Sequence, residues 1–202
     1  MTFRSSTYLG LVLALSAMTS YGASNNDAER SVTQACGLCH GHDGNSTSPL
    51  FPRLAGQTAA YIDTQLRAFR AHQRADPPAQ AYMWGMASQL DDMQIAHLAA
   101  YFAAQPVRVS TSPSSNPAGA GKAIYETGVP AQGIPACVSC HGDAAEGRSA
   151  YPRLRGQHPE YLLKQLQYFK SRLRSTDPVM LDLCDRLTEE QMRAVAQYAA
   201  LR

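Results

Sequence analysis

Two stretches of six residues contain the side chains that could do chemistry: residues 36–41 read CGLCHG and residues 137–142 read CVSCHG. Two cysteines separated by two residues can form a redox disulfide, half of a zinc site or a covalent anchor for haem. A thioredoxin-like disulfide would need a βαβ setting, which the flanking sequence does not show. A zinc site within one stretch would be one ligand short, and four cysteines shared between the stretches would leave both histidines unused. A structural disulfide would close a strained ring and would not explain the histidine.

Covalent haem attachment uses every one of these residues. On one helical turn the side chains at i and i+3 share a face, so both thiols can add to the vinyl groups of one porphyrin, and the next residue can ligate its iron. We therefore predict two haem c groups, one on each stretch. The predicted attachment residues are Cys36, Cys39, Cys137 and Cys140, and the predicted axial ligands are His40 and His141.

The second axial ligand of each iron is predicted from the methionines. No other histidine has a histidine counterpart in the second half of the chain, whereas Met83 lies seven residues before Leu90 and Met180 lies seven before Leu187. We predict Met83 and Met180 as ligands, in an irregular stretch before the last helix of each half. Met86 is the alternative in the first half, and the competing interpretation for all three is a methionine that fills a gap in the core.

Two prolines are candidates to support the axial histidines. Ligating histidines usually donate their second N–H to a fixed acceptor, and Pro52 and Pro152 follow the histidines by 12 and 11 residues, each just before an Arg-Leu pair. Their carbonyl groups are predicted acceptors; two ordinary loop prolines are the alternative. With histidine and methionine on each iron, no position stays open for oxygen or peroxide, which favours outer-sphere electron transfer.

The sequence elements that must position these residues form an internal repeat. Residues 51–57 (FPRLAGQ) recur as 151–157 (YPRLRGQ), and a Tyr-x3-Gln-Leu-x2-Phe pattern at 61–69 recurs at 161–169. Apolar residues in both copies follow helical spacing, and no alternating strand pattern occurs, so we predict an all-α protein of two domains. The predicted domains are 25–104 and 119–202, joined by a Pro- and Ser-rich linker at 105–118. Asp91 with Gln94 and Thr188 with Gln191 predict capping boxes at the last helix of each copy.

The N-terminus and the composition limit the location and the partners. Residues 1–24 contain Arg4, an apolar run and then small residues, the order of a secretory signal peptide cleaved between about 22 and 25. The apolar run is short for a membrane span, so we expect an exported mature chain without a transmembrane segment; an uncleaved N-terminal anchor is the alternative. A net charge of +2 with no Lys/Arg-rich block does not predict nucleic-acid binding. The fifth cysteine, Cys184, has Ala87 as its counterpart and is interpreted as a small buried hydrophobe, with an intermolecular or regulatory disulfide as the alternative.

Taken together, the two CxxCH stretches, the paired PRLxGQ motifs and the repeated Met-x6-Leu spacing resemble the dihaem cytochrome c4 family. The resemblance implies two class I cytochrome c domains related by a pseudo-twofold axis, each built around one covalent haem. It also implies a periplasmic electron carrier, not an enzyme, with a quinol–cytochrome c reductase or a dehydrogenase as donor and a membrane oxidase as acceptor. The same resemblance carries over the axial pairs His40 with Met83 and His141 with Met180. A cytochrome subunit of a dehydrogenase or a dihaem peroxidase is the alternative function.

Overall fold

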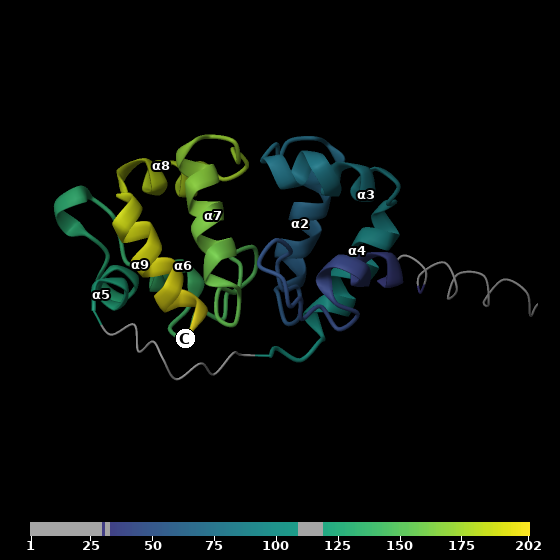
Figure 1. Ribbon diagram of the computed structural model, residues 1–202, viewed down its shortest axis with the longest axis horizontal. Helices are drawn as coiled ribbons and strands as arrows, with labels where there is room; N and C mark the ends of the chain where they lie inside the picture. Colours follow the sequence, from purple (N-terminus) through teal and green to yellow (C-terminus); the bar gives the residue numbers. More distant parts are fainter. Residues whose placement is uncertain (1–29, 31–32, 109–118) are drawn as a thin grey trace, which may run out of the picture.

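The computed structural model describes residue 30, residues 33–108 and residues 119–202, which fold into two helical domains (Figure 1). The predicted signal peptide and residues 109–118 of the predicted linker lie outside the described residues. No β-sheet forms in the part of the chain that the structure describes, where the extended contacts are isolated bridges. The prediction of an all-α protein with two domains is therefore confirmed.

The continuously described part of the first domain starts with a helical segment at residues 33–40, which contains the first CxxCH stretch. The following elements are the helix α2 (Ala59–Arg70), a π-helical turn η1 (Ala79–Met83), α3 (Trp84–Ser88) and α4 (Asp92–Ala103). Ile62 and Leu66 of α2 are buried against Ile95 and Leu98 of α4, and this contact forms the core of the domain. Burial of this apolar stripe stabilises two helices whose intrinsic propensity alone would not hold them.

The second domain repeats this arrangement, and the structure there also describes a helix N-terminal to the attachment stretch. Its elements are α5 (Ala120–Thr127), a short 3₁₀ turn η2 (Pro130–Gln132), α6 (Val138–His141), α7 (Pro159–Lys170), α8 (Pro178–Arg186) and α9 (Glu189–Ala200). Helix α5 packs on α9, where Tyr125 and Met192 are fully buried. Figure 1 shows α2 and α7 on the two sides of the boundary between the domains.

The helix termini follow the sequence signals. Both predicted capping boxes are present: Asp91 and Gln94 close the start of α4, and Thr188 and Gln191 close the start of α9. Each box satisfies two backbone N–H groups that would otherwise lack a partner.

The prediction that both methionines lie in irregular backbone is wrong. Met83 is the last residue of the π-helical turn η1, and Met180 lies in the first turn of α8. In the second domain the cause is local, because the Asp177 side chain accepts hydrogen bonds from the backbone N–H groups of Val179 and Met180, and Pro178 occupies the first helical position.

Candidate functional site

The first candidate site is built on the helical segment that carries Cys36, Cys39 and His40. His40 is 7% exposed, and its Nδ1 lies 2.9 Å from the carbonyl oxygen of Pro52. Because that oxygen can only accept, Nδ1 must carry the proton, and Nε2 is left with a free lone pair. Burial lowers the pKa of His40, while the hydrogen bond to Pro52 acts in the opposite direction. The imidazole is therefore neutral and oriented, which is the state that ligates a metal.

The second candidate site has the same geometry. His141 ends α6, is 8% exposed, and has Nδ1 at 3.0 Å from the carbonyl oxygen of Pro152. Burial again lowers the pKa of this histidine. In both domains the glycine after the histidine, Gly41 or Gly142, has a positive φ angle, which ends the helical turn at a conformation that side chains disfavour. The glycine of each six-residue stretch thus fixes the exit of the chain behind the histidine.

In each domain the first of the two attachment cysteines borders the same apolar cluster as the predicted methionine ligand. In the first domain Cys36 and Met83 both pack against the cluster that contains Ile62 and Leu66. In the second domain Cys137 and Met180 both pack against the cluster that contains Leu162 and Phe169. Burial raises the pKa of the Cys137 thiol to about 11 and raises that of Cys36 as well. As free thiols, before any covalent attachment, these groups are therefore neutral at physiological pH, unlike a reactive redox cysteine.

The remaining methionines differ in exposure. Met86, the alternative ligand of the first domain, is 43% exposed, and Met93 is 79% exposed. Met192 is fully buried in the α9 core. Met83 and Met180 are the partly buried methionines that border an attachment cluster.

A zinc site would need a cluster of ligand side chains within the described residues. There, no group of three or more His, Cys, Asp or Glu side chains could hold a metal ion, and the two cysteine pairs lie in different domains. Cys184 is fully buried and unpaired, which agrees with its interpretation as a small hydrophobe. His158 is also buried, and its Nε2 lies 3.0 Å from the carbonyl oxygen of Ser46 in the other domain.

The residues that sequence reasoning missed form the boundary between the domains. Gln57 exchanges two hydrogen bonds with the backbone N–H and C=O of Arg153, at 2.6 and 3.1 Å. Gln157 does the same with the backbone of Arg53, at 2.9 and 3.0 Å. These pairs are related by a pseudo-twofold axis, and their residues come from the repeated PRLxGQ motif. The signal was the repetition of an arginine and a glutamine, both polar, at one spacing in the two copies.

A second pseudo-symmetric contact lies further along the same boundary. The guanidinium groups of Arg74 and Arg174 both donate to the Oε1 atom of Gln165, at 2.7 and 2.8 Å, and both also donate to Gln65. The symmetry ends at Asp76, whose carboxylate accepts from Arg74 Nε at 2.7 Å. Arg174 Nε is buried without a hydrogen-bond partner.

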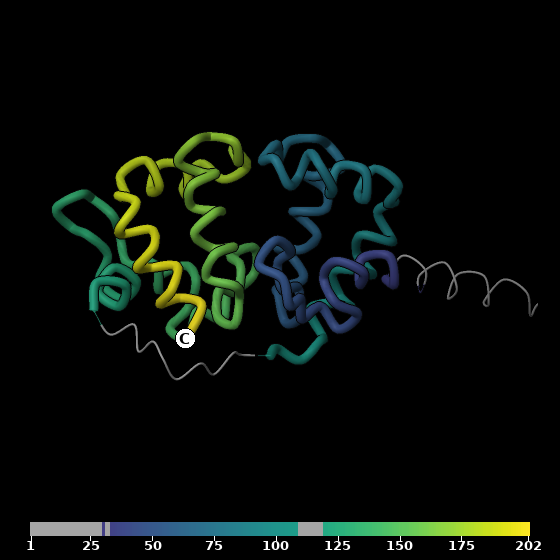
Figure 2. Tube along the Cα trace, viewed as in Figure 1, coloured from purple at the N-terminus to yellow at the C-terminus, as the bar shows by residue number. Residues whose placement is uncertain are grey.

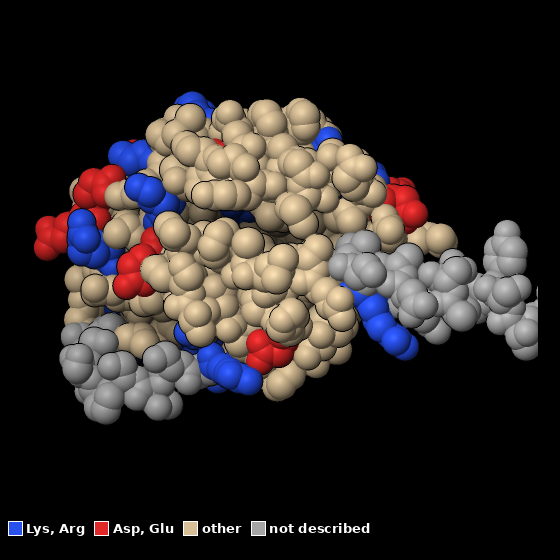
Figure 3. All heavy atoms as spheres, turned by 45° about the vertical axis from the view of Figure 1, so that its right-hand side comes forward, with Lys and Arg blue, Asp and Glu red and all other residues tan. Residues whose placement is uncertain are grey.

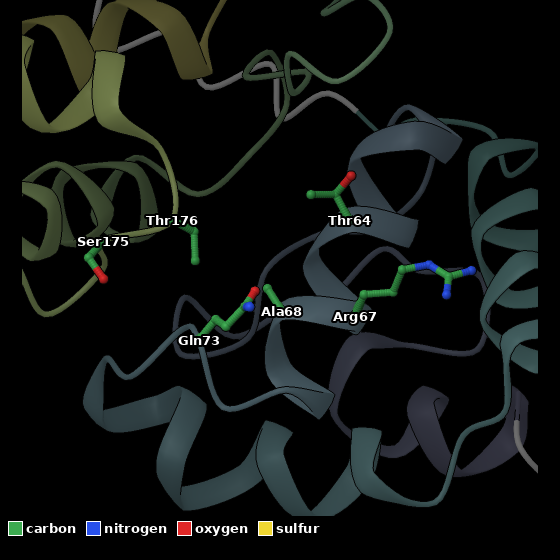
Figure 4. Close-up of a pocket in the computed structure, with 6 residues that line it drawn as sticks. All are labelled: Thr64, Arg67, Ala68, Gln73, Ser175 and Thr176. Atoms are coloured by element: carbon green, nitrogen blue, oxygen red, sulfur yellow. The ribbon is translucent and has the colours of Figure 1, made fainter.

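A cavity of about 570 Å³ opens beside this contact. Its lining residues are Thr64, Arg67, Ala68 and Gln73 of the first domain and Ser175 and Thr176 of the second (Figure 4). Figure 4 shows Arg67 extending away from Ser175 and Thr176. No attachment cysteine or candidate axial ligand lines this cavity, which is therefore separate from both candidate sites.

Comparison with known proteins decides what the paired sites are. The family model described as Cytochrome c matches twice, at residues 26–105 and 118–199. A solved cytochrome c4 structure from Acidithiobacillus ferrooxidans superimposes with a TM-score of 0.78 at 40% identity, covering 84% of this chain and 99% of that one. The chain belongs to the dihaem cytochrome c4 family. Cytochrome c4 of Azotobacter vinelandii is 35% identical over 88% of this chain and 89% of its own length. Cytochrome c-552 of Acidithiobacillus ferridurans is 40% identical over 93% and 82%, respectively.

Family membership gives the chain two covalent haem c groups, one per domain, and makes it an electron-transfer cytochrome instead of an enzyme. The residues present fit this cofactor: each domain supplies two cysteines, a neutral histidine whose Nδ1 is held by a proline carbonyl, and an apolar cluster that borders the first cysteine. A further relative is named thiosulfate dehydrogenase electron acceptor, from Thiomonas intermedia; it is 36% identical over 82% of this chain and 77% of its own length. None of the described helices combines the length and the apolar composition that a membrane crossing requires.

Proposed function

We propose that this cytochrome carries electrons between respiratory partner proteins in the periplasm, through two haem c groups that are each ligated by histidine and methionine. The attachment residues are Cys36, Cys39, Cys137 and Cys140, and the axial pairs are His40 with Met83 and His141 with Met180. The observation that carries the proposal is that each domain packs one cysteine of its CxxCH stretch and a partly buried methionine on one apolar cluster, with a neutral buried histidine at the end of that stretch.

The chain prepares each site in three ways. The carbonyl groups of Pro52 and Pro152 hold the histidine rings in one tautomer and one orientation, so that Nε2 is the ligating atom. The apolar clusters would shield the haem from water, and the thioether of Met83 or Met180 would be the second protein ligand of the iron. A bound haem c supplies one-electron redox chemistry at its iron, and a thioether ligand favours the reduced state.

Electron exchange with a partner requires exposed surface near the cofactor on which the partner can dock. The first domain supplies it: Leu38 within the attachment stretch is 83% exposed, and Leu50 and Tyr82 are 74% and 56% exposed. Figure 3, in which the side of the first domain comes forward, shows charged side chains gathered mainly toward the rim of a broad uncharged area. We infer that partners meet the protein through contacts that are mainly apolar.

The location and the partners follow from the N-terminal sequence and the family. A signal-peptide pattern at residues 1–24 supports export to the periplasm. A membrane oxidase is the proposed acceptor, and a quinol–cytochrome c reductase or a dehydrogenase is the proposed donor. The relative named thiosulfate dehydrogenase electron acceptor supports the dehydrogenase as donor, a role in which the chain is still a carrier.

The axial ligands can be tested by substitution in the holoprotein. Met83→Ala and Met180→Ala should each remove about half of the methionine–iron charge-transfer absorbance, because each domain loses one ligand. Met86→Leu is the matched control and should leave the spectrum unchanged, since Met86 is exposed. An unchanged spectrum for Met83→Ala together with a loss for Met86→Leu would move the ligand to Met86.

A further inference from the structure

One peptide unit connects each candidate axial histidine to the opposite domain. The carbonyl oxygen of Pro52 receives the hydrogen bond of His40 Nδ1 at 2.9 Å, and the adjoining N–H, that of Arg53, donates to Gln157 Oε1 at 2.9 Å. The C=O and the N–H belong to the same planar, conjugated amide. His40 in the first domain and Gln157 in the second therefore hold opposite sides of one peptide.

The second domain has the reciprocal arrangement. The carbonyl oxygen of Pro152 lies 3.0 Å from His141 Nδ1, and the N–H of Arg153 donates to Gln57 Oε1 at 2.6 Å. The two loops that contain these peptides meet at the centre of the molecule, where the blue segment near residue 50 lies against the green segment near residue 150 (Figure 2). We refer to the units Pro52–Arg53 and Pro152–Arg153 as the two linking peptides.

Each glutamine is held so that its oxygen must face the linking peptide. The Nε2 atom of Gln157 donates to the Arg53 carbonyl at 3.0 Å, and that of Gln57 donates to the Arg153 carbonyl at 3.1 Å. Both side chains are 5% exposed, so water does not compete for these contacts. Each glutamine thus makes two hydrogen bonds to the backbone of one arginine in the opposite domain, and this pair of bonds fixes the position of the linking peptide.

The hydrogen bond at the N–H side changes the strength of the bond at the C=O side. When the N–H of an amide donates, charge moves toward its carbonyl oxygen, and consecutive hydrogen bonds strengthen one another by roughly 10–30%. A stronger acceptor at Nδ1–H raises the basicity of Nε2. A more basic histidine stabilises the oxidised iron and lowers the reduction potential.

We propose that Gln157 is a positioning residue for His40, and Gln57 for His141, so that each domain sets the orientation and basicity of the axial histidine of the other. This inference rests on the proposed histidine ligation. If the inference holds, the contact between the domains affects the reduction potentials of both haems, because separation of the domains removes both glutamine contacts and raises both potentials. Neither domain alone has the potential that it has in the intact chain.

The test uses redox titration of the intact holoprotein with matched variants of both glutamines. Gln157→Leu should raise one of the two midpoint potentials, that of the first domain, and Gln57→Leu should raise the other. Gln157→Glu retains an acceptor for the Arg53 N–H, adds a negative charge and loses the donor to the Arg53 carbonyl, so it should bring the potential to the wild-type value or below it while the protein stays less stable. Gln157→Asn withdraws the amide from the linking peptide with a smaller loss of packing, and it should raise the same potential as leucine even if the leucine variant does not fold.

Two results would overturn the inference. One is that neither potential responds to leucine or asparagine; the other is that both glutamines affect the same haem. Covalent haem content and the methionine–iron charge-transfer band are measured on the same samples. Absence of that band in the wild-type protein would contradict the proposed function. If the band is present in every variant but neither potential changes, only the proposed effect of the glutamines is contradicted.

Discussion

The buried ion pair between Arg74 and Asp76 gives the sharpest stability prediction. The Nε and Oδ2 atoms are 2.7 Å apart, and the two side chains are 5% and 1% exposed. Asp76→Asn removes the carboxylate charge and leaves a guanidinium group buried at the boundary between the domains. Removing one partner of a buried pair costs about 3 kcal/mol or more, because the remaining charge cannot return to water. At a urea dependence of about 2 kcal/mol per molar, the unfolding midpoint should fall by about 1.5 M.

The assay is urea unfolding of the holoprotein, followed by far-ultraviolet circular dichroism. Asp63→Asn is the matched control, because Asp63 pairs with Arg67 on the exposed side of α2, where ion pairs contribute little. Thr176→Ala is a second control, since Thr176 stands where the first domain has Asp76. If Asp76→Asn unfolds at the same urea concentration as Asp63→Asn, the buried pair does not stabilise the boundary and the reasoning is refuted.

Two further predictions follow from burial and capping. Burial raises the pKa of the Cys184 thiol to about 12, so at pH 8 only about one molecule in 10⁴ carries the thiolate. A thiol reagent should therefore label no cysteine in the native holoprotein and one cysteine per chain after unfolding. Rapid labelling of the native protein would contradict the burial of Cys184, and more than one labelled thiol after unfolding would contradict the thioether bonds. Thr188→Ala and Asp91→Ala each remove a capping-box side chain and should each lower the free energy of unfolding by about 1 kcal/mol in urea titrations; equal stability of both variants and the wild type would show that the caps are dispensable.

Much of the site could be predicted because its chemistry is local in sequence. The cysteine pair and the following histidine lie within five residues, at i, i+3 and i+4 of one helical turn, and the glycine after them ends that turn. The contacts from Pro52 and Pro152 to the histidines were also expected from spacing, and the structure contains both hydrogen bonds. Capping boxes are four-residue signals and were predictable for the same reason.

The domain boundary could not be predicted because its contacts join residues about 100 positions apart. Gln57 and Gln157 end the same PRLxGQ motif, and nothing in either copy shows that each bonds to the other domain instead of its own. The helical setting of Met83 and Met180 was missed because the residues that precede the two methionines differ between the domains. The capping effect of Asp177 and Pro178 has no equivalent in the first domain, where Pro77 and Pro78 precede a π-helical turn.

The most direct test of an electron carrier with two haems is a reversible redox titration of the wild-type holoprotein, monitored by its haem absorbance. We predict two one-electron steps per chain, recovered without loss when the titration is reversed, because each domain carries one covalent haem with both axial positions filled. A single one-electron step, or an iron that binds an added ligand as soon as it is oxidised, would contradict this account.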